Sequence, residues 1–461
     1  MNDLKNKRVL LVHPEIARTK YNFRGVIDNE PLELEMLWTL LKAEGAVVDI
    51  WDGQVEEKPF RARMRSFRPD AVYICGRTRQ EPFMKEYCTE VKAYNKDAYT
   101  VIGGLHAQIN PNRFFDPATD AVITSCDPYV TVALLKGEKP RNLDGVCFRD
   151  AGGRFRRTKA LPFDADKLPR PDRTQFLRYR HRYRYLDLAP CAHVRTALSC
   201  PYHCDFCYRN HINCGTYTVR DIEDVVEEIA SVDCDNIYIF DDDFLLNEQR
   251  LERFITLLKE RGIRKQFVCY GRADFIASHP SLMEELAKAG MTYVLVGLEF
   301  VEERRLNRFR KGTSEQENIS AIKICKKAGI RVMGLFIAEP DFRAKDFRNM
   351  YRFIKRHDLR HVGISLFVPE MGLPIFSQYR DRLVTTKPEH WDYLHVVVRP
   401  THMGVRRYYF YYHVLLLKLF IRGYRQGIYS FLDYKGFIRS IAQNMFRFGG
   451  NRSASQEAQD G

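Results

Sequence analysis

The stretch Cys200-Pro201-Tyr202-His203-Cys204-Asp205-Phe206-Cys207 is the most informative part of this chain, because it places three cysteines in the spacing C-x3-C-x2-C. Three thiolates on one short loop can bind an iron–sulfur cluster, and three protein ligands then leave one iron open. An open metal position can bind and activate another molecule, as open catalytic zinc sites do. The motif therefore predicts a reactive metal centre.

Two other interpretations of the motif remain open. A structural zinc ion could take its fourth ligand from His203, His211 or Cys214. Zinc sites usually combine two close pairs of ligands, however, and no second pair with that spacing is present in the sequence. The three cysteines could also be unrelated buried thiols, which their tight clustering disfavours.

The chain beyond the cysteines repeats a unit of about 30 residues, in which a strand-like run precedes a helix-like run. The strand-like runs are rich in Val, Ile, Phe and Tyr with little alternation, which is typical of strands buried on both faces. They cover residues 194–199, 236–241, 267–271, 293–299, 332–338 and 361–368, and amphipathic runs lie between them at 221–229, 251–261, 281–289 and 314–328. Six such units predict a parallel sheet that curves into a partial (β/α)6 TIM-like barrel, with all strand C-termini on one side.

Polar or turn residues follow each predicted strand at equivalent positions. They are Cys200, the run Asp241-Asp242-Asp243, Arg272, Glu299, Glu339 and Pro369. Taken singly, each of these residues can simply cap a helix or form a turn, and aspartate is favoured at such caps. This alternative stays open for Asp243 and Glu339. Glu299 differs, because it closes an apolar strand and a buried carboxylate requires a partner.

The first 150 residues predict a separate, doubly wound Rossmann-like domain. Strand-like runs at residues 8–14, 46–50, 71–75, 99–102 and 121–124 alternate with helical runs. Ligands of such sheets bind across the strand C-termini. The loops there are His13-Pro14, Cys75-Gly76-Arg77-Thr78, Gly103-Gly104-Leu105-His106-Ala107 and Ser125-Cys126-Asp127-Pro128. No G-x-G-x-x-G sequence follows the first strand, so a dinucleotide site has little support.

The cysteine motif and the strand before it resemble the radical S-adenosylmethionine (SAM) superfamily. In that family the cluster's open iron binds the amino and carboxylate groups of SAM, and an electron from the cluster cleaves SAM to a 5′-deoxyadenosyl radical. Val296-Gly297-Leu298-Glu299-Phe300 resembles the family's fourth-strand signature, which Lys311 and residues 321–329 continue. The resemblance implies SAM contacts from Phe206, Asp241, Asp242, Arg272, Glu299 and Glu339. Glu339 is followed by Pro340 where many relatives have glycine, so an alternative is that it faces the substrate.

The aspartate run and the N-terminal domain resemble the cobalamin-binding branch of that superfamily, and Gly103-Gly104-Leu105-His106-Ala107 is the best match. The resemblance implies cobalamin contacts from His13, Cys75, Gly76, Arg77, Thr78, Gly103, Gly104 and His106. The D-x-H-x-x-G motif, whose histidine binds cobalt from below in other cobalamin proteins, is absent, which leaves the lower cobalt ligand unassigned.

Composition is compatible with these expectations. The 461 residues are enough for two or three domains, and the 12 cysteines do not follow the spacing of secreted modules. The first residues are polar and then enter a strand, so we expect no signal peptide and a cytoplasmic location. The net charge of +14 favours an anionic substrate or a membrane surface before nucleic acid, and a merely solvated basic surface is the alternative.

Residues 408–421 are apolar and aromatic but too short and too interrupted to span a membrane. The flanking Arg406, Arg407, Arg422 and Arg425 would suit a helix lying on a membrane, whereas packing on the open side of the barrel is the interpretation we prefer. The expected organisation is a cobalamin-type domain (1–150), a linker (151–190), a radical SAM barrel (191–380), a helical region (381–450) and a disordered tail (451–461).

The function that this resemblance implies first is methylation of an unactivated carbon by a cobalamin-dependent radical SAM enzyme. Ring formation or rearrangement with the same cofactors is the second possibility. A metal- or corrinoid-binding protein without activity is the third. We expect a small-molecule, lipid or peptide substrate and an external electron donor of the flavodoxin or ferredoxin type, and we do not expect nucleic acid.

Overall fold

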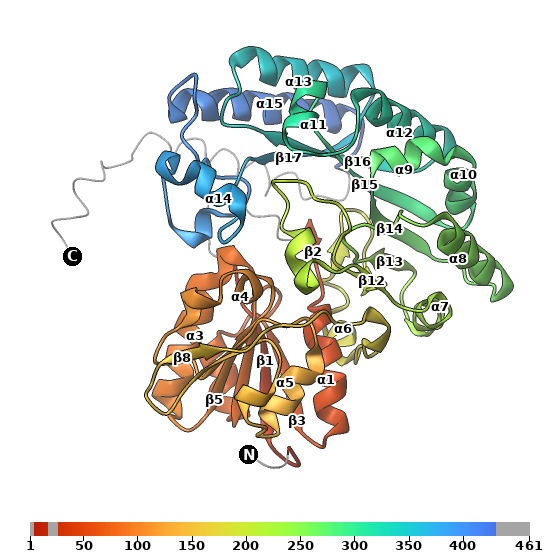
Figure 1. Ribbon diagram of the computed structural model, residues 1–461. Coiled ribbons are helices and arrows are strands. Elements are labelled where there is room, and N and C mark those ends of the chain that lie inside the picture. Colours follow the sequence, from red (N-terminus) through yellow and green to blue (C-terminus); the bar gives the residue numbers. More distant parts are fainter. Residues whose placement is uncertain (1–3, 17–25, 430–461) are drawn as a thin grey trace.

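The computed structural model describes residues 4–16 and 26–429, so the expected tail and the end of the helical region lie outside the described residues. Two α/β units stand one above the other in Figure 1, the N-terminal one in red and orange and the second in green to blue. Each unit is built around its own sheet. The predicted combination of a Rossmann-like domain with a partial barrel is confirmed.

The N-terminal sheet has the strand order β3-β1-β4-β5-β6-β7-β8. Its strands are β1 (Arg8–His13), β3 (Val47–Asp52), β4 (Ala71–Cys75), β5 (Tyr99–Gly103), β6 (Ala121–Ile123), β7 (Val146–Arg149) and β8 (Phe155–Arg157). The first five are parallel, as predicted. The antiparallel hairpin β7–β8 was not predicted, because its strands are short and one of them is mostly Arg. Helices α1 (Leu32–Ala43), α2 (Phe60–Phe67), α3 (Glu81–Tyr94), α4 (Leu105–Ile109) and α5 (Pro128–Leu135) accompany the sheet, which carries a hydrophobic core on each face.

The second sheet has six parallel strands in the order β10-β13-β14-β15-β16-β17. They are β10 (Ala192–Val194), β13 (Asn236–Ile239), β14 (Gln266–Gly271), β15 (Met291–Glu299), β16 (Arg331–Ala338) and β17 (His361–Leu366). Helices on the outside of the sheet separate them in the chain: α7 (Ile222–Ser231), α8 (Glu248–Glu260), α9 (Ala273–Ser278), α10 (Pro280–Lys288), α11 (Glu303–Arg308), α12 (Glu315–Ala328) and α13 (Ala344–Arg356). Figure 1 shows the sheet curving with these helices around it. The predicted order of βα units is confirmed.

The first strand of the barrel differs from the prediction of one strand over residues 194–199. Strand β10 ends at Val194, and β11 (Ala197–Leu198) leaves the barrel to pair antiparallel with β12 (Thr218–Val219). The carboxylate of Asp241 accepts hydrogen bonds from the backbone N–H groups of Thr196 (2.7 Å) and Ala197 (3.0 Å), so these groups are not available to the sheet. The cysteine loop therefore begins on a segment that has already left the sheet.

The C-terminal region supplies α14 (Pro374–Tyr379) and the long helix α15 (Val405–Arg425). One face of α15 packs beside α13, where Tyr408 and Tyr412 are buried. Their hydroxyl groups donate hydrogen bonds to the carbonyl oxygens of Glu339 (2.7 Å) and Ile364 (2.9 Å). The helix is thus fixed to the ends of the last two barrel strands.

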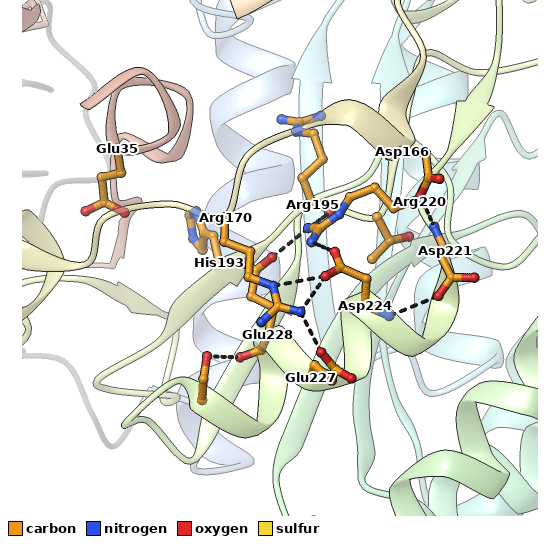
Figure 2. Close-up of polar contacts among 12 residues, drawn as sticks. Glu35, Asp166, Arg170, His193, Arg195, Arg220, Asp221, Asp224, Glu227 and Glu228 are labelled. Atoms are coloured by element: carbon orange, nitrogen blue, oxygen red, sulfur yellow. Dashed lines mark hydrogen bonds and ion pairs between the residues drawn. The ribbon is translucent and has the colours of Figure 1, made fainter. Parts of the chain in front are cut away.

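An ion network joins α1, the segment before the barrel and α7. Arg173 pairs with Glu30 (2.9 Å) and Glu228 (2.8 Å), and its closest approach to the buried carboxylate of Glu35 is 3.8 Å. Nearer the surface, Arg170 contacts two carboxylates of α7 (Figure 2). Arg173 therefore compensates buried charges, whereas Arg170 forms exposed pairs.

We expect Arg173→Met to lower the free energy of unfolding by about 3–5 kcal/mol, because it leaves buried carboxylates without their cation. The matched substitution Arg170→Met removes a cation whose side chain is 43% exposed, and should cost at most about 1 kcal/mol. Urea-induced unfolding followed by circular dichroism compares the two variants. Equal losses would contradict the assignment.

We also expect stability to depend on pH through Glu35. Burial, together with the neighbouring carboxylate of Glu30, raises the pKa of Glu35 well above its usual value near 4.5. The folded protein then holds a proton that the unfolded chain has lost, so this contribution to stability is complete below pH 4.5 and disappears as the pH rises through the folded pKa. As the pH rises above 4.5, Glu35→Gln should therefore lose less stability than the wild type, while Glu86→Gln on the surface of α3 should behave as the wild type.

Candidate active site

The cysteine loop lies at the C-terminal edge of the barrel, between β11 and the 3-10 stretch Arg209–Gly215. The backbone N–H of Asp205 donates to the carbonyl of Phe309 (3.2 Å), and the Asp205 carboxylate accepts from Arg310 Nε (2.8 Å). The ring of Phe206 meets the ring of Phe300 edge to face, with centroids 6.3 Å apart. The segment that follows β15 thus holds the loop in place.

The three cysteines of the motif are free thiols, and Cys204 is the most buried. Burial raises the pKa of Cys200 to about 11 and that of Cys207 to about 12, so a metal that binds here has to displace protons. Over residues 4–16 and 26–429, no three His, Cys, Asp or Glu side chains are grouped to hold a single metal ion. A set of three sulfur donors on one loop fits an iron–sulfur cluster with one open iron.

Two cations lie behind the loop. Lys311 Nζ pairs with Glu299 Oε1 at 3.2 Å, and both side chains are buried. Arg272 pairs with Asp274 (2.9 Å), donates to the carbonyl of Lys311 (3.0 Å) and stacks 3.6 Å from the ring centre of Tyr202 in the cysteine loop. Glu299 therefore has the partner that its position at the end of an apolar strand required.

Steric constraints explain why Gly297, in the fourth-strand signature, has no side chain. A Cβ atom at Gly297 would lie 2.4 Å from Glu299 Oε1 and 2.9 Å from Lys311 Nζ. The strand pairing shifts register at the same place, and Glu299 has a positive φ of 56°. The absence of a side chain at Gly297 thus makes room for the Glu299–Lys311 pair.

The aspartate run contains three carboxylates in three different surroundings. Asp241 is buried and bonded to backbone N–H groups, as described above. Asp242 lines a cavity and lies 3.5 Å from Arg209 Nε. Asp243 is 3% exposed, and neither carboxylate oxygen has a hydrogen-bond partner among the described residues. Burial raises the pKa of Asp243 to about 8 despite nearby Arg272, so this site lacks a partner for the carboxylate.

Glu339 is held by arginines. It is fully buried, and its carboxylate pairs with Arg305 (2.8 Å) and with Arg308. Asp341 joins the same two arginines. The expected contact of Glu339 with SAM would thus have to compete with these two arginines.

A cavity of about 2000 Å³ extends between the strand C-termini of the two units and along α15, with mostly apolar walls. Of the residues expected near cobalamin, His13, Cys75, Gly76, Arg77 and Gly104 line it, and so do Asp241 and Asp242 from the barrel. Thr78, Gly103 and His106 are not among its lining residues. The structure thus brings part of the expected cobalamin set together with two residues of the expected SAM set. The cavity lining does not include Phe206, Arg272, Glu299, Glu339 or the three cysteines, although it reaches Tyr208 and Arg209 directly after the cysteine motif.

The three residues of the cobalamin set outside the cavity lining have structural partners. His106 is buried, with Nε2 2.7 Å from Glu81 Oε2 and Nδ1 3.2 Å from Thr78 Oγ1. A Cβ atom at Gly103 would lie 2.0 Å from Tyr73 Oη, so this glycine is required by Tyr73. Gly104 has a φ of +85°, a conformation that favours glycine in a loop facing the cavity.

Contacts between the two units set the cavity beside the cysteine loop. Arg77 Nη1 lies 3.4 Å from the hydroxyl of Tyr208, directly after Cys207. Asn110 Nδ2 donates to the carbonyl of Met371 (2.8 Å), where the segment before α14 meets α4 (Figure 1). Sequence reasoning did not single out Tyr208 or Arg209 as cavity residues, although their place directly after the motif was a usable signal.

Residues 194–354 match the model of the radical SAM superfamily. The chain belongs to this superfamily. Residues 26–133 of this radical SAM protein match the model of the B12 binding domain, so the cavity runs between a B12 binding domain and a radical SAM barrel. The zinc-site and unrelated-thiol interpretations of the motif lose their basis.

Several relatives resemble this radical SAM protein over most of its length. The hopanoid C-3 methylase of Methylococcus capsulatus is 25% identical over 87% of this chain and 78% of its own. The anaerobic magnesium-protoporphyrin IX monomethyl ester cyclase of Cereibacter sphaeroides is 23% identical over 85% and 67%. The solved structure of the methyltransferase TsrM from Kitasatospora setae shares the fold, with a TM-score of 0.66, 18% identity and coverage of 83% and 80%.

The aspartate run allows a matched test of structural and binding roles. Asp241→Ala leaves two backbone N–H groups without their acceptor and should lower the free energy of unfolding by about 2 kcal/mol or more. Asp243→Ala removes a buried carboxyl that has no partner to lose, so we expect little change or a gain. Urea denaturation of the metal-free protein measures both. A larger loss for Asp243→Ala would show that its carboxyl has a structural partner.

Proposed function

We propose that this protein is a cobalamin-dependent radical SAM enzyme that methylates an unactivated carbon of a small molecule. The observation that carries the proposal is a cavity that runs from the strand-end loops of the B12 binding domain to Tyr208 and Arg209, which directly follow the cysteine motif. A methyl carrier on one side and a radical source on the other could act on one substrate held between them. Proximity of this kind lowers the barrier of a reaction between bound groups.

The described residues offer a place for each cofactor. Cys200, Cys204 and Cys207 would hold the cluster, and the unpaired carboxylate of Asp243 would accept the ammonium group of SAM. Of the expected SAM contacts, we retain Phe206, Asp242, Arg272 and Glu299 as candidates and assign Asp241 and Glu339 to structural roles. When bound, the cluster supplies the electron that cleaves SAM, and cobalamin carries the methyl group.

The cobalamin would lie against the strand-end loops of the B12 binding domain. Cys75, Gly76, Arg77 and Gly104 form this wall, and the backbone at Gly104 presents no side chain to a flat ligand. His13 lines the same wall, but its ring nitrogens lie 3.1 Å from Asp52 and 2.7 Å from Gln54. We therefore assign no lower cobalt ligand.

The residues of the chain prepare the cavity for radical chemistry. Apolar side chains from the barrel strands, among them Leu295, Met333 and Leu335, face it and exclude water from a reactive intermediate. Arg209 lies over the ring of Tyr270 at 4.2 Å and donates to the carbonyl of Asp242 (2.7 Å), which orders the boundary between the cavity and the cysteine loop.

Ring formation is the second candidate, because a relative of similar coverage is a cyclase. Transfer of a labelled methyl group from SAM to the product separates the two: methylation requires it, and ring formation leaves the product unlabelled. An external electron donor of the flavodoxin or ferredoxin type is part of both proposals.

Cys204→Ala tests the enzyme assignment. We expect anaerobically reconstituted Cys204→Ala to lack a stable [4Fe–4S] cluster and to release no 5′-deoxyadenosine from SAM, while it still binds cobalamin. The matched control is Cys214→Ala, because Cys214 is exposed and lies outside the motif. Iron and sulfide content, absorption spectra and chromatography of the SAM products provide the measurements. SAM cleavage by Cys204→Ala at the wild-type rate would refute the proposal.

A further inference from the structure

Helix α15 presents a continuous apolar stripe on the side away from α13. Its exposed large apolar side chains are Phe410, Leu417, Ile421 and Tyr424, which are 61%, 47%, 42% and 55% exposed. At 3.6 residues per turn these positions lie within one narrow sector of the helix. The buried residues of the helix, Tyr408, Tyr412, Leu415 and Gly423, lie on the opposite side. Exposed apolar side chains that gather on one face of a helix are a candidate interaction surface.

Basic residues border this stripe. Arg407, Lys418 and Arg425 are exposed and follow one edge of the apolar sector, and Arg406 lies near its start. The 21 residues of α15 include no Asp or Glu. A helix with an apolar face, flanking cations and aromatic residues at the boundary binds in the interface of a lipid bilayer, with its apolar face among the acyl chains. The cations favour anionic headgroups.

The same helix forms a wall of the large cavity. Tyr409, His413, Leu416 and Phe420 line the cavity from the adjacent side of α15. Phe410 and Leu417 both line it and are exposed, so the cavity opens beside the apolar stripe. None of the described helices is long and apolar enough to cross a membrane, and contact by way of α15 would be confined to one leaflet.

We propose that α15 docks this protein on an anionic membrane surface and places the mouth of the cavity there, so that its substrate is an apolar molecule dissolved in the bilayer. A second copy of the chain is a poorer occupant of the stripe, because it would bring two rows of like charges together. The statement about the substrate rests on the proposed function, whereas membrane docking does not depend on activity and is tested separately.

Vesicle binding tests the docking surface. The full-length protein should sediment with vesicles of phosphatidylglycerol and phosphatidylcholine, bind pure phosphatidylcholine less well, and be released by high salt. Leu417→Glu/Ile421→Glu and the triple reversal Arg407→Glu/Lys418→Glu/Arg425→Glu should each weaken binding about tenfold or more. The matched controls are Leu177→Glu/Val384→Glu, which change exposed apolar residues elsewhere, and Lys139→Glu/Arg141→Glu/Arg154→Glu, which change exposed cations of the N-terminal unit.

Insertion of the helix is measured with a tryptophan probe. Leu417→Trp should add emission that shifts to the blue with anionic vesicles and is quenched by brominated lipid, whereas Leu177→Trp should show neither change. Equal binding of the α15 variants and their controls would overturn the proposal, as would the absence of wild-type binding. A wild-type dimer that Leu417→Glu/Ile421→Glu converts to a monomer, without vesicle binding, would identify the stripe as a protein interface instead. None of these readouts requires SAM cleavage, so a failure of the proposed function is seen separately.

Discussion

The position of the cysteine loop depends on the hydrogen bonds that Asp241 makes to Thr196 and Ala197. A parallel strand at the edge of a sheet ordinarily continues as long as its backbone groups find partners in the neighbouring strand. Here a side chain at the end of β13 provides those partners, and the chain leaves the sheet after Val194. The cysteine loop can then reach across the strand ends, where the segment after β15 receives Asp205 and Phe206.

The charges around the loop follow from the same geometry. The ends of β14 and β15 lie at one edge of the barrel, so Arg272 and Glu299 come close to each other there. Lys311, in the segment between α11 and α12, joins them beneath the loop. Pairing satisfies Glu299 and Lys311, whereas the buried carboxylate of Asp243 has no hydrogen-bond partner within residues 4–16 and 26–429. A buried carboxyl that has no partner reduces stability. A cation that arrives with a ligand would supply that partner, which is why we propose Asp243 and not Asp241 as the SAM contact.

Much of this architecture could be predicted from the sequence. The repeat of apolar strands and amphipathic helices indicated six parallel units, and the local C-x3-C-x2-C spacing indicated the metal centre, because both signals depend on residues close in the chain. Contacts between elements that are distant in the chain produce no comparable local sequence pattern and could not be predicted in this way. The identical side chains Asp241, Asp242 and Asp243 differ only in what the fold places beside them, and Gly103 is required by the ring of Tyr73 on a neighbouring strand. The sequence likewise suggested that His106 contacts a cofactor, whereas in the structure its ring pairs with the carboxylate of Glu81 in α3.

The cavity also depends on the contact between the two units, which is why neither domain sequence indicates it by itself. Arg173 pairs at once with Glu30, just before α1, and with Glu228 of α7, so the two units share a buried electrostatic centre instead of meeting through surface pairs alone. Such a centre resists hinge motion, because separating the units would leave buried charge unpaired. Elsewhere the cavity is bounded by α15, and a substrate of the proposed apolar kind would enter along this helix. The exposed apolar stripe of α15 lies beside the part of the helix that lines the cavity. The surface that would bind lipid and the proposed entrance to the cavity therefore lie on the same helix.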